Sequence, residues 1–267
     1  MPELPDVETM RRYLQATSLH REIEAVDVHS DQMMEHTSVQ ELRQALIGRS
    51  FDHTCRHGKV LFVALDEGSD DVLLLHFGMT GGLAYFKAMG EEPAYDRLLL
   101  HFANGYHLAY YAMRKLGQVE VIDDVERFVR ERGLGPDVLD PAFDLATFKE
   151  LVEGRRVMTK AFLMDQHTVA GIGNVYADEI LFQGGIHPRT KINRLDEETL
   201  EGLFHAVKDV LEQAIACRAQ PDRFPDTFIA PHRHEGGRCP ICGAELERVK
   251  VSSRTAYYCP ECQPKEG

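Results

Sequence analysis

Four cysteines near the C-terminus constrain this chain more than any other feature. Cys239 and Cys242 form one Cys-x-x-Cys pair, Cys259 and Cys262 form a second, and 16 residues separate the pairs. This spacing favours four thiolates around one Zn²⁺, a closed tetrahedral site that is structural because it leaves no position for a substrate. Rubredoxin-like iron or a redox-active dithiol pair is the alternative. The intervening residues alternate enough to predict a β-hairpin that the metal holds in place.

The remaining cysteines and the chain termini indicate a cytoplasmic protein. Cys55 and Cys217 stand alone, so the pattern is not that of a secreted disulfide framework. The N-terminus is acidic and lacks a secretory signal pattern, and no apolar run reaches the 18 residues that suggest a membrane span. With 267 residues, the chain is long enough for one large or two modest domains.

The first half of the chain reads as a β-domain with a leading helix. Residues 3–16 have helical spacing. Short runs rich in Val, Leu, Ile, Phe and Tyr follow, separated by turn residues, and they predict strands of a sandwich or barrel. These runs are 59–65, 72–77, 97–103, 106–111 and 118–122. Asn104-Gly105, between two of them, is a hairpin signal.

The pattern becomes helical after residues 133–141. Predicted helices cover 144–153, 158–165, 174–183 and 196–217, with Asp196 or a neighbour as a start signal. The predicted fold is therefore α+β, with an N-terminal two-sheet β-sandwich, a helical domain and a Cys-rich finger. The expected boundaries are a β-domain over 1–133, a linker over 134–143, a helical domain over 144–230 and the finger over 231–267.

The charge balance argues against nucleic-acid binding. The net charge is −13, and residues 1–150 carry 15 basic against 26 acidic side chains, whereas residues 231–267 carry six against five. Phosphate contacts need Lys and Arg, so an acidic protein is a poor candidate for binding DNA. This objection fails only if the basic residues line one groove while the acids cover the outer faces.

The first residues, MPELPDVE, suggest covalent chemistry. A Met-Pro start favours removal of the methionine, which leaves Pro2 with a free amine whose ordinary pKa is about 8. Such an amine attacks carbonyl-like carbons and forms Schiff bases, and Glu3 can move protons at the same centre. The alternative is a solvated terminus whose Asp6 and Glu8 favour the dipole of a helix.

Two further segments suggest anion binding. Residues 170–174 (AGIGN) form a glycine-bearing turn before a helix, whose first N–H groups make an anion site beside the Asn174 amide. Arg254 lies near the tip of the predicted hairpin, beside hydroxyl residues, where it suits phosphate contact. The alternatives are a plain capped helix and an ordinary solvated arginine.

Taken together, these stretches resemble the formamidopyrimidine-DNA glycosylase / endonuclease VIII family of base-excision repair enzymes. The matching stretches are PELPDVE, HGKVLFVAL around Lys59, LLLHFGMTGGL around Met79, LGPDVL, KAFLMDQHTVAGIGNVYADEILF and the four-cysteine finger with SSRTAYYCPECQ. They span nearly the whole chain in the family's order. The PELP start is more similar to the formamidopyrimidine branch.

The resemblance implies a bifunctional DNA glycosylase and AP lyase that acts on damaged double-stranded DNA. Pro2 would attack C1′ of the damaged nucleotide, displace an oxidised base and form a Schiff base, while Glu3 relays protons at the sugar. β,δ-Elimination would then cut the strand. The resemblance also implies a helix-two-turns-helix motif, one structural Zn²⁺ in the finger, a monomer, and a cytoplasmic protein associated with the nucleoid through DNA.

The family's other functional residues fall on named positions of this chain. Lys59, Asn174 and Arg254 would grip the phosphates around the flipped nucleotide, because C1′ is inaccessible inside a duplex. The residues expected to fill the vacated gap, or to contact the backbone near it, are Met79, Arg114, Leu116, Arg97, Arg156 and Lys160. Met79 is equally explained as a core residue, since Met commonly fills gaps in cores.

Three departures from the family's pattern bear on the substrate. The wedge stretch is AMRKLG (112–117), so the wedge aromatic is replaced by Leu116, which intercalates but cannot stack as a ring can. Arg97 stands where a histidine is frequent. The run 217–239 is short and lacks the Gly-Gly-Thr/Ser motif of the lid over oxidised purines. Formamidopyrimidines, hydantoins, oxidised pyrimidines or abasic sites are therefore expected to be better substrates than 8-oxoguanine.

Two other functions remain open. One is a catalytically weak or inactive protein of the same fold that binds DNA lesions, which the acidity and the altered wedge favour. The other is a zinc protein that binds a protein partner through its acidic N-terminal domain, which the charge favours but which leaves Pro2, Glu3 and Lys59 unexplained.

Overall fold

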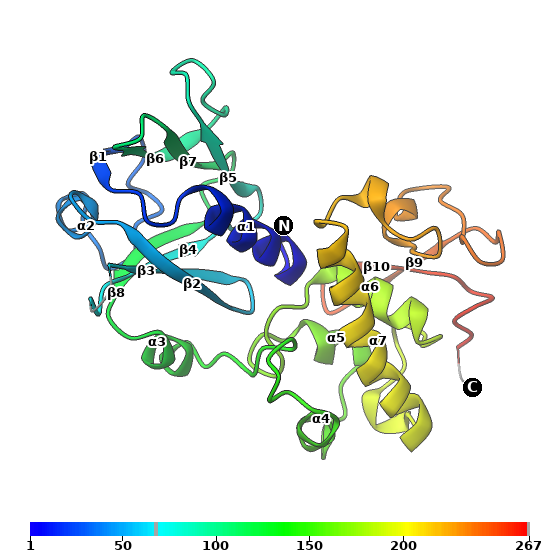
Figure 1. The fold of residues 1–267 in the computed structure, drawn as a ribbon. Coiled ribbons are helices and arrows are strands. Elements are labelled where there is room, and N and C mark those ends of the chain that lie inside the picture. The colour runs from blue at the N-terminus through cyan, green and yellow to red at the C-terminus, as the bar shows by residue number, and fades with distance from the viewer. Residues whose placement is uncertain (67–68, 266–267) are drawn as a thin grey trace. The chain divides into compact units, whose positions relative to one another are not determined.

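The computed structural model describes residues 1–66 and 69–265 and divides the chain into two compact units (Figure 1). The first unit contains residues 1–2 and 6–133, and the second contains residues 3–5 and those from 134 onward. The first helix, α1 (Leu4–Thr17), therefore has its first residues in the second unit and the rest in the first. Among the described residues, no helix combines the length and hydropathy needed to cross a membrane.

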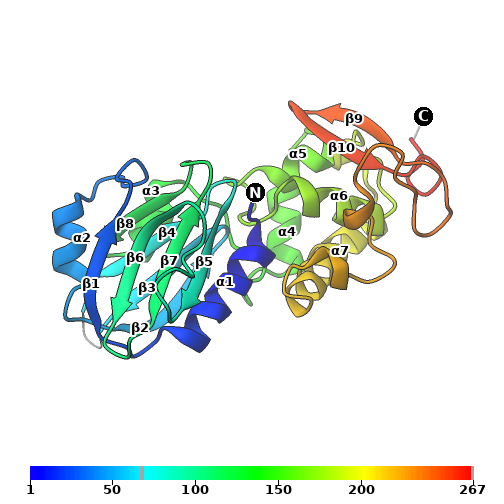
Figure 2. The same ribbon diagram turned by 90° about the horizontal axis from the view of Figure 1, so that it is seen from above.

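The first unit is a sandwich of two four-stranded antiparallel sheets (Figure 2). One sheet has the order β2-β3-β4-β8 and the other the order β1-β6-β7-β5. The strands are β1 (Ile23–Val28), β2 (Phe51–His57), β3 (Val60–Leu65), β4 (Val72–His76), β5 (Gly81–Phe86), β6 (Asp96–Phe102), β7 (His107–Ala112) and β8 (Gln118–Ile122). Helices α2 (Val39–Leu46) and α3 (Val125–Glu131) complete the unit.

A single apolar core lies between the two sheets. Leu61 and Leu75 come from one sheet, Leu100 and Leu108 from the other, and all are almost fully buried. Alternate residues of a strand point to opposite faces, so β3 contributes every second side chain, Leu61, Val63 and Leu65, to this core. Val7 of α1 joins the same cluster, which fixes the part of the helix that belongs to this unit.

The five predicted strands are confirmed to within a residue or so at their ends, and Asn104-Gly105 lies in the turn between β6 and β7. Gly105 has φ of +76°, the left-handed conformation that such turns require. Strands β1, β2 and β5 and helices α2 and α3 were not predicted. β2 is largely polar and β5 begins with two glycines, so neither has the apolar run used to recognise the others.

The second unit is helical up to the Cys-rich finger. Its helices are α4 (Leu145–Val152), α5 (Thr159–Met164), α6 (Asn174–Gln183) and α7 (Glu197–Ala216), with short 3₁₀ turns at Ile192–Arg194, Pro221–Arg223 and Ala230–His232. The predicted helices are confirmed to within one residue at either end, and the Asp196 carboxylate accepts a hydrogen bond from the Thr199 amide as the predicted cap of α7. The mixed α+β fold is therefore as expected.

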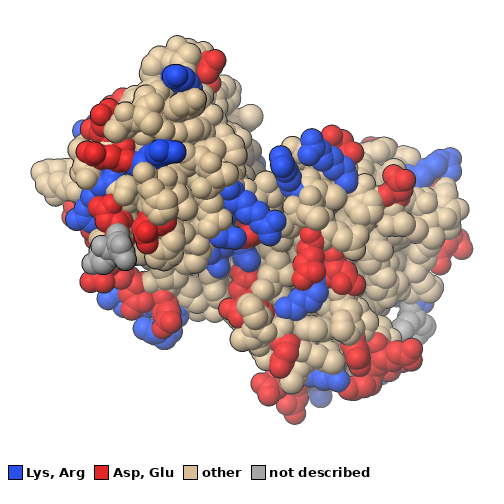
Figure 3. All heavy atoms as spheres, viewed as in Figure 1, with Lys and Arg blue, Asp and Glu red and all other residues tan. Residues whose placement is uncertain are grey.

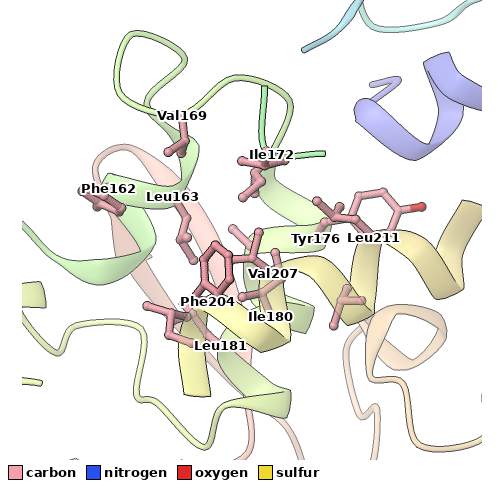
Figure 4. Packing of buried hydrophobic residues seen from close by; sticks show 14 of the residues in the cluster. Phe162, Leu163, Val169, Ile172, Tyr176, Ile180, Leu181, Phe204, Val207 and Leu211 are labelled. Carbon is pink, nitrogen blue, oxygen red and sulfur yellow. The ribbon is translucent and has the colours of Figure 1, made fainter. Parts of the chain in front are cut away.

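The helices enclose a second apolar core (Figure 4). Ile180 of α6 packs with Phe204 and Val207 of α7 and with Phe162 of α5. Leu4, at the start of α1, belongs to this cluster and donates its backbone N–H to the carbonyl of Gly171 at 3.0 Å. The first residues of the chain are therefore packed against the turn that leads into α6.

Candidate active site and zinc centre

The four cysteines of the finger lie together. Their Sγ atoms are all within 4.8 Å of one another, with 3.8 Å between Cys239 and Cys262 and 3.4 Å between Cys242 and Cys259. A tetrahedral Zn²⁺ with bonds of 2.3 Å needs sulfurs about 3.8 Å apart, so the donor set and its spacing fit the ion. Cys239 and Cys259 are buried. A closed set of four thiolates makes this a structural zinc site.

The finger presents Arg254 at the tip of a tight hairpin. Strands β9 (Glu247–Val251) and β10 (Arg254–Tyr258) pair in register, and Ser252 and Ser253 form the two-residue turn between them. Both serines have positive φ, +45° and +64°, as the turn that matches strand twist requires. Arg254 pairs with Val251 directly beside the turn, and its side chain is exposed. The hairpin therefore presents the Arg254 side chain to solvent, directly beside its tight turn.

The start of α6 holds the carboxylate of Glu3. Oε2 accepts hydrogen bonds from the amides of Gly173 at 2.8 Å and Tyr176 at 3.2 Å, and Oε1 accepts one from the amide of Val175 at 2.9 Å. These N–H groups belong to the first turn, where no backbone acceptor is available within the helix. Glu3 is only 2 % exposed. The expected anion site thus exists, and Glu3 itself is the anion.

Gly173 allows this close approach. A Cβ atom at this position would collide with the Glu3 side chain. The glycine has φ of −123°, so the space beside its backbone is the reason for its presence and not its conformational freedom. Gly173 therefore serves the placement of the Glu3 carboxylate, whereas Gly171, with φ of +114°, lies against the Leu4 side chain.

Asn174 is the first residue of α6 and does not cap the helix. Its Oδ1 atom is buried and has no hydrogen-bond partner among the described residues. A buried amide oxygen without a partner costs free energy, so the fold alone does not account for this side chain. The explanation of Asn174 as a simple cap is excluded, because Gly173 occupies the cap position.

Lys59 lies in the first unit, in the turn between β2 and β3. We expected it on a strand, but β2 ends at His57 and β3 begins at Val60, so Gly58 and Lys59 form the turn. Nη1 of Arg56 donates to the Gly58 carbonyl at 3.0 Å, and Nε of Arg56 contacts the Glu8 carboxylate at 3.4 Å. The turn is thus braced from α1, the helix that follows Pro2.

The three residues expected to fill the gap are brought together by two loops of the first unit. Met79 lies between β4 and β5, whereas Arg114 and Leu116 lie between β7 and β8. The amide of Arg114 donates to Oγ1 of Thr80 at 2.9 Å, which joins the loops. Leu116 is 55 % exposed, and Arg114 is exposed as well. Met79 is only partly buried, so it is not a core residue.

The remaining predicted DNA contacts fall in three different environments. Arg97 donates from Nε to the Ala112 carbonyl at 2.9 Å and stacks on the Tyr95 ring, so it braces the loop that carries Arg114. Arg156 is exposed before α5. Lys160 is fully buried and ion-paired with Asp178 at 2.5 Å. A direct contact of Lys160 with a DNA backbone is at odds with this burial.

Asp178 and Arg233, which form a buried cluster with Lys160, were not among the predicted site residues. Both oxygens of Asp178 are hydrogen-bonded, and Asp178 is 0 % exposed. The signal was present in the run YADEILF, where two acidic residues interrupt an apolar helix that is buried on most sides. A buried carboxylate needs a partner, so such an interruption predicts a cation elsewhere in the chain.

Charge is unevenly distributed on the second unit. On the face drawn in Figure 3, acidic side chains gather at the lower end of this unit, and Lys and Arg gather at its upper edge. The net charge of −13 is therefore compatible with local basic surface, as binding of an anion by an acidic protein requires.

Comparison with known proteins agrees with this arrangement. Residues 1–119 match the model of the formamidopyrimidine-DNA glycosylase N-terminal domain, residues 134–224 match that of its H2TH domain, and residues 236–265 match a zinc finger found in FPG and IleRS. The formamidopyrimidine-DNA glycosylase of Moorella thermoacetica is 35% identical and aligns over 100% of this chain and 94% of its own length. That of Pelotomaculum thermopropionicum is 31% identical over 98% and 99%.

Solved structures give the same answer. A structure of MutM in complex with DNA containing carbocyclic 8-oxo-G has a TM-score of 0.88 and 30% identity, and covers 99% of this chain and 100% of that chain. Lactococcus lactis Fpg with DNA containing an abasic site has a TM-score of 0.88 and 30% identity, over 98% and 100%. The chain belongs to the formamidopyrimidine-DNA glycosylase family.

Proposed function

We propose that this protein excises oxidised bases from double-stranded DNA and cuts the strand at the resulting site, with Pro2 as the nucleophile. The relatives named above are formamidopyrimidine-DNA glycosylases, and similar solved structures hold DNA with 8-oxo-G or an abasic site. The observation that carries the assignment to these residues is the placement of Glu3. Its carboxylate is fixed by three amides of α6, and the nucleophile is the preceding residue in the chain.

The chemistry follows from these two neighbours. After removal of Met1, which is 51% exposed, the Pro2 nitrogen attacks C1′, and the damaged base leaves with a proton. The sugar ring opens to give a Schiff base between Pro2 and C1′. Loss of the proton at C2′ then expels the 3′ phosphate, and a second elimination expels the 5′ phosphate. Glu3 transfers protons at the sugar in these steps.

The remaining residues have supporting roles in this proposal. Lys59, Asn174 and Arg254 bind the phosphates beside the extruded nucleotide, since a reaction at C1′ requires the nucleotide outside the duplex. Met79, Arg114 and Leu116 occupy the space that it leaves, and Arg97 and Arg156 lie along the DNA backbone. Lys160 is left out of this set because it is buried. We further propose that the protein acts as a monomer in the cytoplasm, at the nucleoid.

The segment between α7 and the finger supports a preference for lesions other than 8-oxoguanine. Phe228 and Ile229 are buried, and the rings of Phe224 and Phe228 pack at 5.5 Å. Nε2 of Gln183 and the Glu179 carboxylate hold the backbone of Thr227 and Ala230. Residues 228–230 are held in place and are poorly suited to act as a lid, so formamidopyrimidines and abasic sites are the favoured substrates, with oxidised pyrimidines as the alternative.

Borohydride trapping tests the proposal. Zinc-loaded protein lacking Met1 is incubated with duplexes that carry formamidopyrimidine-guanine, 8-oxoguanine, dihydrothymine or an abasic site, and reduction then fixes any Schiff base. We expect a covalent complex on the N-terminal peptide, strongest with the abasic and formamidopyrimidine duplexes, and none when Met1 is retained. Pro2→Gly should trap less with a damaged base than with an abasic site.

A catalytically inactive lesion-binding protein is the second candidate, favoured by the acidic composition. It would bind the same duplexes without being trapped on any of them. The slope of binding against salt then reports the number of phosphates contacted, since each contact releases counterions.

A further inference from the structure

The buried carboxylate of Asp178 connects four segments of the second unit. Oδ1 accepts from Nζ of Lys160 on α5 at 2.5 Å. Oδ2 accepts from Nε and Nη2 of Arg233, at 3.0 and 2.7 Å, and from the backbone amide of Tyr257 on β10 at 3.0 Å. Lys160 continues the connection, because its Nζ also contacts the Thr255 carbonyl at 3.4 Å. Asp178 and Lys160 are both fully buried.

These contacts connect α6, which carries Asn174, with the β9–β10 hairpin, which carries Arg254. Both residues are proposed phosphate contacts. Asp178 lies one turn along α6 from Asn174, and Tyr257 lies three residues along β10 from Arg254. Arg233 touches both sides, since its guanidinium stacks on the Tyr257 ring at 5.3 Å and Nη2 contacts the Asn174 carbonyl at 3.4 Å. Glu3 binds the same end of α6.

Stability alone is a weak explanation for such a cluster. Removing two cations and a carboxylate from water is costly, and an apolar set of the same shape is often equally stable. A hydrogen-bonded carboxylate also fixes the relative positions of its donors, because each donor must lie roughly along a lone pair of the oxygen. No strand pairs with β10 on this side among the described residues, so side chains set the place of the hairpin relative to α6.

We propose that Asp178, with Arg233, is a positioning residue that holds Arg254 at a fixed place relative to Asn174 and Glu3. It acts through the hairpin and does not touch DNA. The inference rests on the proposed function, because it takes Arg254 as a phosphate contact of the reacting nucleotide.

The charge of Asp178 allows a positioning role to be distinguished from a general electrostatic effect on DNA binding. Asp178→Asn removes a negative charge from an acidic protein, so electrostatics alone would tighten DNA binding. The positioning role has the opposite consequence. Single-turnover cleavage of abasic duplex should slow on the order of 10²-fold, since a displacement of about 1 Å at a contact has effects of this size.

A double-mutant cycle with Arg254→Gln is the decisive experiment. If Asp178 acts through Arg254, the double variant should cleave within about threefold of Arg254→Gln alone, because the residues then act as a unit. If the double variant instead lost rate by the product of the two single effects, the inference would be overturned. So would an unchanged rate in Asp178→Asn.

Two variants guard against simple unfolding. Arg233→Lys keeps the charge and loses the two-pronged contact with Asp178, so a smaller loss in the same cycle with Arg254→Gln is expected. Val207→Ala removes buried volume from the apolar core of the same unit and leaves the polar residues of the cluster unchanged. It should lower the melting temperature without lowering the rate. Zinc content and melting are measured for every variant, and slowing of Val207→Ala to the level of Asp178→Asn at matched stability would overturn the inference.

Failure of the inference is distinct from failure of the proposed function. A wild-type protein that is neither trapped nor active contradicts the proposed function. An active wild type with a slow Arg254→Gln and a normal Asp178→Asn contradicts only the positioning role. A normal Arg254→Gln removes the phosphate contact through which Asp178 is inferred to act, and the inference fails with it.

Discussion

The two units hold the side chains proposed to be functional in different ways. In the first unit, Lys59 lies in a turn between two registered strands, and the loops with Met79 and Leu116 connect strands of the same sandwich. In the second unit, Glu3 is held by amides and the Arg254 hairpin by a buried carboxylate. In a β-sheet, many backbone hydrogen bonds together fix the position of each strand. The second unit depends on single side chains, so its activity should be the more easily lost.

Zinc removal should give the largest effect and confine it to the second unit. A structural zinc in a small finger supplies about 10–16 kcal/mol of folding free energy, so Cys259→Ser or chelation should disorder β9–β10 and abolish cleavage of abasic duplex. Hydrogen exchange of β3 and β4 in the first unit should not change. Cys217→Ser, which alters a cysteine outside the cluster, is the matched control. Full activity in metal-free protein would contradict the comparison.

One buried glutamate in each unit gives the next test. Burial opposes ionisation of Glu8, but hydrogen bonds from Arg11 and Arg12 outweigh it and lower its pKa from 4.5 to about 2. Burial raises the pKa of Glu179 from 4.5 to about 7, and the hydrogen bonds from Gln183 and the Ala230 amide offset it only in part. The surroundings of Glu8 thus favour its charged form, and those of Glu179 favour its neutral form.

The contributions of Glu8 and Glu179 to stability should therefore depend on pH in opposite directions. The stability from Glu8 is present above pH 4.5 and lost as pH falls towards 2, because the unfolded carboxyl binds its proton first. The stability from Glu179 is present below pH 4.5 and lost as pH rises through 7. The contribution of Glu179 amounts to about 3 kcal/mol. That of Glu8 is smaller, because Arg12 is exposed and solvent screens its interaction with the carboxylate. Urea unfolding of Glu8→Gln, Glu179→Gln and wild type at several pH values measures both contributions. If the free energy lost in the two variants changed with pH in the same direction, the assignment would be contradicted.

Gly173→Ala should separate the placement of Glu3 from its chemistry. The new Cβ displaces the Glu3 carboxylate from α6, so base excision should fall by up to about 10²-fold, or about 2.7 kcal/mol, while the protein stays folded. Gly202→Ala on α7 is the matched control, because nothing lies within 4 Å of its added Cβ. It should leave excision unchanged and raise stability slightly. Normal excision by Gly173→Ala would remove the requirement for a fixed Glu3.

Local sequence patterns predicted what is set locally. Apolar runs marked β3, β4 and β8, the acidic cap marked α7, and the cysteine spacing marked the metal centre. β2 was missed because it is largely polar, and β1 was missed because its alternation is broken by irregular pairing near Ile23, where the strand departs from simple register. A pattern of period two does not survive such an irregularity.

Contacts between distant residues account for the rest. The hydrogen bond between Glu3 and Gly173 joins residues 170 positions apart, and no local sequence pattern predicts it. Lys160 was expected to contact the DNA backbone, although lysine is buried only where it has a partner. Its partner Asp178 lies 18 residues further along, and the pair is buried together. The resemblance located Glu3 and Asn174 as functional residues, but their mutual placement required the fold.

The smallest effect is expected at the wedge, where the first unit departs from its family. Leu116 is 55 % exposed at the end of a loop, so Leu116→Phe should leave the core and the fold unchanged. A ring stacks on a base where Leu only intercalates, and base–aromatic stacking contributes about 1–3 kcal/mol. Because Leu already provides part of this contact, we expect a gain of about 1 kcal/mol, or about fivefold, in affinity for duplex with an abasic analogue.

Leu116→Ala provides the opposite change and should weaken binding by a similar factor. Met113→Phe places a ring on the same loop at another exposed position, and it should have no effect if the wedge is specific to residue 116. Equal affinities of the Leu, Phe and Ala forms would show that the loop of the first unit does not enter the duplex. The contrast between the units would then be stronger, because fewer side chains of the first unit would take part in recognition of the lesion.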